Sequence, residues 1–118
     1  MRRGDVWTAA GGRGYAGKPR PVVIVQDDRF DATASITICG FTTDPTEAPL
    51  FRLSIDPSQD NGLEAQSRLM VDKITTMPRA SLGQQIGRLS DADMVRLDRA
   101  IVIFLGLAGH PVRRRARQ

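Results

Sequence analysis

The 118-residue sequence contains few of the side chains on which most enzymes depend. It has one cysteine, Cys39, and one histidine, His110. A single cysteine cannot form a disulfide within its chain, so nothing in the composition points to an oxidising compartment. Cys39 lies in the apolar run SITICGF, and we interpret it as a buried side chain rather than a nucleophile. A Ser-His-Asp triad is excluded because His110 lies near the C-terminus, outside the body of the chain.

Metal-binding and membrane-spanning patterns are also missing. The sequence has neither an H-E-x-x-H motif nor a pair of cysteines. Asp27, Asp28 and Asp31 come closest to a cluster, and we assign them to a turn. The longest apolar run, AIVIFLGLAG, is too short to cross a bilayer, and the charged start MRRGDVW is not followed by the apolar stretch of a signal peptide. We therefore expect a cytoplasmic protein with no metal and no cofactor.

The basic charge is concentrated in two places. The formal net charge is +4, but residues 113–118 hold four of the 17 basic residues, so the remaining chain carries 13 basic and 13 acidic residues. Residues 1–20 hold five basic residues and one acid, whereas residues 21–72 hold three basic residues and nine acids. This distribution predicts a local positive site near the N-terminus and a disordered basic tail at 113–118.

Hydrophobic patterning predicts several short strands followed by one helix. Alternating or β-branched runs indicate strands at residues 4–9, 21–26, 34–43, 50–55, 67–77 and 83–89, with a bend near Asp72 in the fifth. Asn61 and Gly62 form a turn dipeptide. Ser90 is a good N-cap for a helix whose apolar face extends to Leu105. Past residue 100 the helix is apolar almost all round, which favours burial within the domain or in a homodimer.

The segment GGRGYAGKPRP, residues 11–21, resembles a phosphate-binding loop of the G-x-x-x-x-G-K type. That motif ends in a Ser or Thr and leads into a helix. Here Pro19 takes the place of the hydroxyl residue, and a β-branched run follows Pro21, so the helix dipole that would face a nucleotide is missing. We interpret the segment as a glycine-rich loop between two strands, and its polar and aromatic side chains are Arg13, Tyr15, Lys18 and Arg20.

The remaining polar side chains suit reactions whose main demand is charge stabilisation. Cleavage of RNA is one, because the 2′-hydroxyl of the substrate is the nucleophile and the protein chiefly aligns it and stabilises charge on the phosphate. The planar fork of arginine can hold two phosphate oxygens. Arg20, between Pro19 and Pro21, is the best-anchored cation in the loop, although a solvent-facing arginine would fit the pattern equally well. With one Tyr, one Trp and four Phe the chain offers no broad stacking platform, and we expect Trp7 and Phe104 in the core.

Five blocks occur in order along the chain: MRRGDVW, KPRPVVIVQDD, ITICGFTTD, LMVDKITTM and IGRLSDADMVRLDRAIVIFLGL. Through these blocks the sequence resembles the MazF/PemK family of toxins from bacterial type II toxin-antitoxin systems. The resemblance implies a mainly β fold with a C-terminal α-helix, an SH3-like small barrel of the MazF/CcdB/Kid plasmid maintenance toxin type. It implies one toxin domain at residues 1–112. It also implies a homodimer and a metal-independent, sequence-specific endoribonuclease that cuts single-stranded RNA.

The resemblance also assigns roles to individual residues. The catalytic arginine and threonine of the family fall on Arg20 and Thr42. Asp72 matches an Asp that acts as a base in the PemK/Kid branch, but Met70 occupies the place of the arginine that accompanies it, and Lys73 replaces the usual glutamine. We therefore expect Asp72 to have mainly a structural role, such as holding the loop or Arg20, and a catalytic role only in second place. Independently of the resemblance, the chemistry of the loop predicts RNA binding: Arg13 and Lys18 can reach phosphates, and Tyr15 offers a stacking face to an unpaired base. Thr43 and Arg68 are further RNA-binding candidates.

The expected substrate is mRNA, with rRNA or tRNA as alternatives, and its cleavage would stop translation and growth. A MazE-like antitoxin is expected to bind through an acidic C-terminal peptide with hydrophobic anchors. Two other functions stay open: a toxin of the same fold that inhibits DNA gyrase by binding alone, and a nucleic-acid-binding module without catalysis.

Overall fold

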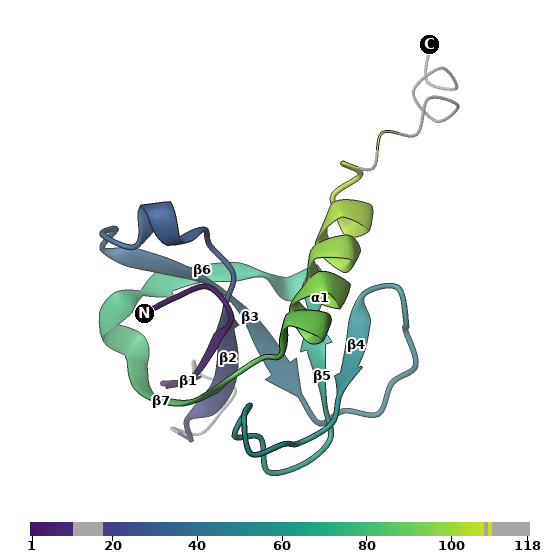
Figure 1. The fold of residues 1–118 in the computed structure, drawn as a ribbon, viewed down its shortest axis with the longest axis horizontal. Helices are drawn as coiled ribbons and strands as arrows, with labels where there is room; N and C mark the ends of the chain where they lie inside the picture. Colours follow the sequence, from purple (N-terminus) through teal and green to yellow (C-terminus); the bar gives the residue numbers. More distant parts are fainter. Residues whose placement is uncertain (11–17, 108, 110–118) are drawn as a thin grey trace.

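The computed structural model describes residues 1–10, 18–107 and 109. Within this part of the chain lie seven strands, three short 3-10 turns and one α-helix (Figure 1). In chain order they are β1 (Asp5–Ala9), β2 (Arg20–Ile24), η2 (Asp28–Phe30), β3 (Ser35–Thr42), β4 (Arg52–Ile55), β5 (Ser67–Met70), η3 (Val71–Lys73), β6 (Thr75–Pro78), η4 (Arg79–Ser81), β7 (Leu82–Arg88) and α1 (Asp91–Phe104). The predicted order of short strands and one terminal helix is confirmed.

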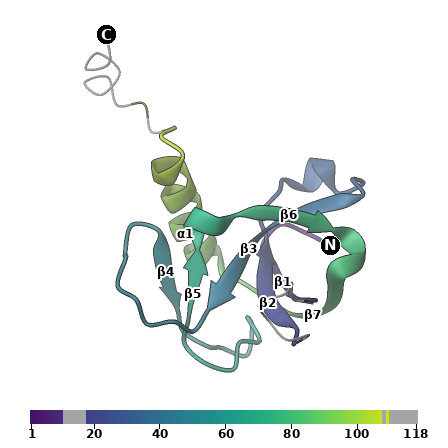
Figure 2. The same cartoon turned by 180° about the vertical axis from the view of Figure 1, so that it is seen from behind.

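The strands form one strongly bent antiparallel sheet in the order β4-β5-β3-β2-β1-β7, and β6 pairs with β3 (Figure 2). β3 is the central strand. Its first residues pair with β6, from Ser35 opposite Pro78 to Ile38 opposite Thr75, and its last residues pair with β5. The predicted bend near Asp72 is therefore real: η3 interrupts the strand and lets β5 and β6 follow different parts of β3.

Two apolar clusters lie on opposite faces of the central strands. Val23 belongs to the larger cluster, which α1 covers, whereas its neighbours Val22 and Ile24 belong to a smaller cluster inside the bend of the sheet. β2 is thus buried on both faces, which explains why its sequence is a continuous β-branched run instead of an alternating one. Trp7, which was expected in the core, is only half-buried and packs against the smaller cluster from outside.

The arginines and aspartates near the N-terminus hold three elements together. Arg3 donates from Nε to the Val25 carbonyl at 2.7 Å and pairs with Asp98 on α1. Asp5 is 5% exposed and accepts from the Arg88 guanidinium at 2.7 Å. The RRGD opening of the chain therefore has a structural role here. The predicted turn after β2 is also confirmed, because the Asp27 carboxylate accepts from the Arg29 amide at the start of η2.

Helix α1 begins at the predicted cap, since the Ser90 hydroxyl accepts from the Asp93 amide at 3.1 Å. Leu97 is fully buried against the sheet. The far end of the helix is not enclosed by the described part of the chain: Phe104 is 46% exposed and touches Phe51 with ring centroids 6.1 Å apart. The expectation that Phe104 lies in the core of the subunit is therefore wrong. Its exposed apolar neighbours are Val102, Ile103, Leu105 and Leu107.

The predicted basic tail, residues 113–118, lies outside the described residues, as do the loop residues Arg13 and Tyr15. In the part of the chain that is described, α1 is the only α-helix, and no helix is long and apolar enough to cross a membrane.

Candidate active site

The pairing of β2 with β3 brings the two predicted catalytic residues to one place on the sheet. Val22 pairs with Gly40 and Ile24 with Ile38. Continued by two residues, this register sets Arg20 opposite Thr42, and side chains two residues apart along a strand point to the same face. Arg20 begins β2 and Thr42 ends β3, so both stand at the margin of the sheet.

Arg20 and Thr42 line one open pocket of about 550 Å³. The other residues of its wall are Phe41, Thr43, Asp44, Pro45 and Met70. Arg20 is exposed and Thr42 is half-buried, so a solvent-borne anion can reach both side chains. The Arg20 guanidinium and the two threonine hydroxyls can donate hydrogen bonds of the kind that phosphate oxygens accept.

The turn that follows Thr42 is fixed by hydrogen bonds from both sides. The Thr42 hydroxyl accepts from the Asp44 amide at 3.1 Å, and Arg68, which pairs with Thr42 across the sheet, donates to the Asp44 carbonyl at 3.2 Å. Arg68 also pairs with Glu47 at 3.3 Å. Arg68 was assigned to RNA binding, and the structure gives it a further task, which is to hold the turn that carries Thr43.

Asp44 is a pocket residue that the sequence analysis did not single out. Its carboxylate accepts from the Thr46 hydroxyl at 2.8 Å and from the Thr46 amide at 3.0 Å, and these bonds lower the pKa of Asp44. Its signal in the sequence is the D-P-T motif directly after a strand, a pattern that is typical of a turn. The site therefore contains a negative charge as well as Arg20.

Asp72 pairs with Arg52, a residue that was not among the candidates. Arg52 donates from Nε to Oδ1 at 2.8 Å and from Nη2 to Oδ2 at 3.1 Å. The two side chains are 14% and 21% exposed, and the hydrogen bonds from Arg52 hold the pKa of Asp72 below its ordinary value. Arg52 lies opposite Met70 in the β4–β5 ladder. A guanidinium from the neighbouring strand thus lies opposite Met70 and pairs with Asp72.

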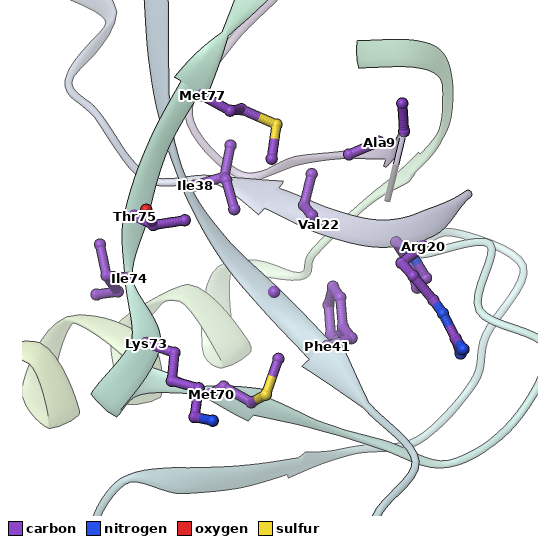
Figure 3. A pocket seen from close by; sticks show the side chains of 13 residues that line it. Ala9, Arg20, Val22, Ile38, Phe41, Met70, Lys73, Ile74, Thr75 and Met77 are labelled. Carbon is purple, nitrogen blue, oxygen red and sulfur yellow. The ribbon is translucent and has the colours of Figure 1, made fainter. Parts of the chain in front are cut away.

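A second, mostly apolar pocket of about 500 Å³ continues from Arg20 along β3 and β6. Figure 3 shows Arg20 and Lys73 on opposite sides of the view, with Phe41 and Met70 between them. Lys73 thus reaches this groove, whereas its neighbour Asp72 is not part of the wall. Lys73 adds a second cation to the groove.

Two of the remaining candidate side chains lie beside Arg20, whereas Cys39 lies in the core. Lys18 and Thr43 line a third pocket together with Arg20. Cys39 is fully buried, and burial raises the pKa of its thiol to about 12, which makes it inert. Among residues 1–10, 18–107 and 109, no three His, Cys, Asp or Glu side chains gather in a way that could hold a metal ion.

The described chain is a strongly bent antiparallel sheet with one C-terminal helix, and an open pocket at the margin of the sheet contains an arginine and two threonines. The chain belongs to the family of PemK-like, MazF-like toxins of type II toxin-antitoxin systems, whose model matches residues 2–105.

Similarity to individual proteins supports this family assignment. A probable endoribonuclease MazF from Mycolicibacterium smegmatis is 60% identical over 109 residues, covering 92% of this chain and all of the relative. The endoribonuclease EndoA of Bacillus subtilis is 30% identical over 115 residues, covering 91% of this chain and 96% of the relative. A solved mycobacterial endoribonuclease in complex with its cognate antitoxin superposes with a TM-score of 0.76 and 28% identity, covering 94% of this chain and 99% of that one. The predicted family and the predicted fold are both confirmed.

Proposed function

We propose that this chain is the toxin of a type II toxin-antitoxin pair and acts as a metal-independent endoribonuclease on single-stranded RNA. The observation that carries the proposal is that Arg20 and Thr42, predicted to be catalytic, line one open pocket at the margin of the sheet. The names of the relatives support the reaction class, because the proteins from Mycolicibacterium smegmatis and Bacillus subtilis are both called endoribonucleases.

In this mechanism Arg20 binds the scissile phosphate. Its planar fork donates to two non-bridging oxygens and stabilises the extra negative charge of the pentacoordinate transition state. Thr42 orients the phosphate or the 2′-hydroxyl. Its oxygen accepts from the Asp44 amide, and its own hydrogen can be donated to the substrate. Both roles depend on positioning, which is worth several orders of magnitude in rate when the reacting atoms are aligned.

The proposed cleavage is a transesterification within the RNA, and it consumes neither water nor a redox partner. The 2′-oxygen of the substrate forms a bond to phosphorus as the bond from phosphorus to the 5′-oxygen breaks. The 2′-hydroxyl loses a proton, and the departing 5′-oxygen gains one. The products are a 2′,3′-cyclic phosphate and a 5′-hydroxyl end, so a 2′-deoxy substrate is not cut.

The assembly that we propose is a cytoplasmic homodimer that its antitoxin inhibits. The exposed apolar end of α1, beyond Ala100, supports a dimer because a subunit that stayed alone would leave this surface in water. The solved mycobacterial relative is an endoribonuclease in complex with its cognate antitoxin. An acidic peptide with apolar anchors would suit the groove between Arg20 and Lys73.

The decisive experiment mixes purified protein with a defined single-stranded RNA in EDTA and identifies the cut ends. We expect 2′,3′-cyclic phosphate ends from the wild type, no cleavage by Arg20→Ala, and no cleavage of a 2′-deoxy copy. Retention of RNA without cleavage would instead identify a binding module. Loss of activity in EDTA that is restored by a divalent metal would overturn the metal-independent mechanism.

A further inference from the structure

A third pocket, of about 480 Å³, adjoins the pocket of Arg20 and Thr42. The two pockets share Arg20 and Thr43, so a nucleotide bound in the third pocket would neighbour the phosphate held by Arg20. The third pocket lies where the end of the β1–β2 connection faces the loop from β4 to β5. We call this loop, residues 56–66, the β4–β5 loop. It contributes Gly62, Leu63, Glu64 and Ala65 to the pocket wall.

The β4–β5 loop is fixed before any ligand binds. The buried Asn61 side chain donates to the Asp56 carbonyl at 2.8 Å and accepts from the Ser58 and Leu63 amides, both at 3.0 Å. Gly62 adopts a φ of 71°, and a Cβ there would lie 2.0 Å from the Ile86 carbonyl oxygen of β7. A loop that packs this closely on a strand loses little freedom when it binds a ligand.

The part of this pocket that lies beside Glu64 does not suit a second phosphate. Lys18 and Arg20 are cationic, but Glu64 on the opposite loop is exposed and carries a negative charge. A phosphate placed against Glu64 would be repelled, whereas the uncharged base of a nucleotide would not. Leu63 and Ile86 supply apolar surface to the same wall. Unpaired bases in RNA are held between apolar surfaces and recognised by hydrogen bonds along their edges.

We propose that the third pocket holds the unpaired base next to the scissile phosphate, and that Glu64 selects a base with an exocyclic amino group. A carboxylate only accepts hydrogen bonds. Adenine, cytosine and guanine each present an amino donor, whereas uracil presents one ring N–H between two carbonyl acceptors, which a carboxylate repels. The inference rests on the proposed ribonuclease function and identifies a residue that determines its sequence preference.

The test compares cleavage of a single-stranded RNA pool of random sequence by the wild type and by Glu64→Gln, with sequencing of the cut ends. The glutamine keeps the shape of the side chain but adds an amide donor that uracil can accept. We expect the wild type to disfavour uracil at one position beside the cut by roughly tenfold, the size of one charge-assisted hydrogen bond. Glu64→Gln should reduce that preference to about threefold or less and leave the other positions unchanged.

Asp60→Asn is the matched control, because it removes one negative charge from the same loop outside the pocket wall. It should cut with the wild-type preference. Thermal unfolding of both variants will show whether the loop has kept its structure. Cleavage by Glu64→Gln with an unchanged nucleotide profile, or the same change in Asp60→Asn, would overturn the inference while the ribonuclease function stood. A wild type that cuts no RNA would overturn both.

Discussion

The ion pair between Arg52 and Asp72 is expected to stabilise the folded protein, and its burial and geometry allow the size of that contribution to be estimated. Asp72→Asn removes the charge that two hydrogen bonds of 2.8 and 3.1 Å satisfy, and it leaves the Arg52 guanidinium, whose side chain is only 14% exposed, without its counter-charge. Exposed pairs contribute 0 to about 1 kcal/mol and breaking fully buried pairs costs about 3 to 5 kcal/mol. We therefore expect the variant to lose about 2 kcal/mol of unfolding free energy at neutral pH.

The loss should depend on pH in a defined direction. Asp72 has a pKa in the folded protein below its ordinary value of 3.8, so its contribution to stability is fully present well above pH 3.8. As the pH falls below that value, protonation of Asp72 in the folded state removes the contribution. Urea unfolding of the wild type and the variant should therefore give a difference that is constant near neutrality and shrinks in acid.

Two further variants complete this experiment. Glu47→Gln makes the same charge change at an 83% exposed partner of Arg68 and should alter stability little. Arg52→Met should destabilise about as much as Asp72→Asn, and the double variant should cost clearly less than the sum. A cost for Asp72→Asn no greater than that for Glu47→Gln would refute the argument. If Asp72→Asn abolished cleavage while Arg52→Met did not, Asp72 would be a catalytic base instead of a residue that positions the bend at η3.

Four other outcomes follow from single residues. Arg20→Lys should lower kcat/KM for RNA about a hundredfold, because a lysine lacks the planar fork that holds two phosphate oxygens, and it should leave the melting temperature unchanged. An unchanged kcat/KM would argue against phosphate binding by Arg20. Under single-turnover conditions, Thr42→Ser should keep most of the cleavage rate, whereas Thr42→Val should cleave at least about tenfold more slowly. Equal rates for the two variants would show that the hydroxyl takes no part in the reaction. Gly87→Ala should lower the unfolding free energy by more than about 2 kcal/mol in urea unfolding, because the added Cβ would lie 2.3 Å from the Asn61 carbonyl carbon. A variant as stable as the wild type would show that the β4–β5 loop can shift to make room at little cost. Cys39 should react with iodoacetamide only after unfolding, because burial raises its pKa to about 12, and rapid labelling of folded protein would contradict its burial.

The strands and the helix could be predicted because their signals are local. Ser90 followed by acidic residues defines the start of α1, and the β-branched run after Pro21 defines β2. The position of Phe104 could not be predicted in the same way. Its apolar character and spacing suit a core residue, but the sheet ends before the last turns of the helix, and a sequence does not reveal how far the opposing surface extends.

The sequence names candidate members of the site, but it does not reveal the contacts that those residues make. Arg20 and Thr42 were found through a resemblance of motifs, whereas the link between Arg52 and Asp72 joins residues 20 positions apart on neighbouring elements. That link requires both the β4–β5 register and the bend at η3. Asp44 was missed because a strand end followed by D-P has a sufficient local explanation as a turn.

The register of the sheet is the physical basis of the proposed activity. Thr42 pairs with Arg68, and the β2–β3 register, continued by two residues, adds Arg20 to the same row. The β3–β5 register, continued by one residue, sets Gly40 beside Met70 in the next row. The first row is polar and lies at the margin of the sheet, while the second closes the pocket from inside. Because the side chains alternate, a slip of β2 by one residue would turn Arg20 to the opposite face and bury Val22 against the wrong cluster. The apolar residues that lock the register therefore also hold Arg20 beside Thr42, so selection for a stable core and selection for the site act on the same strand pairing.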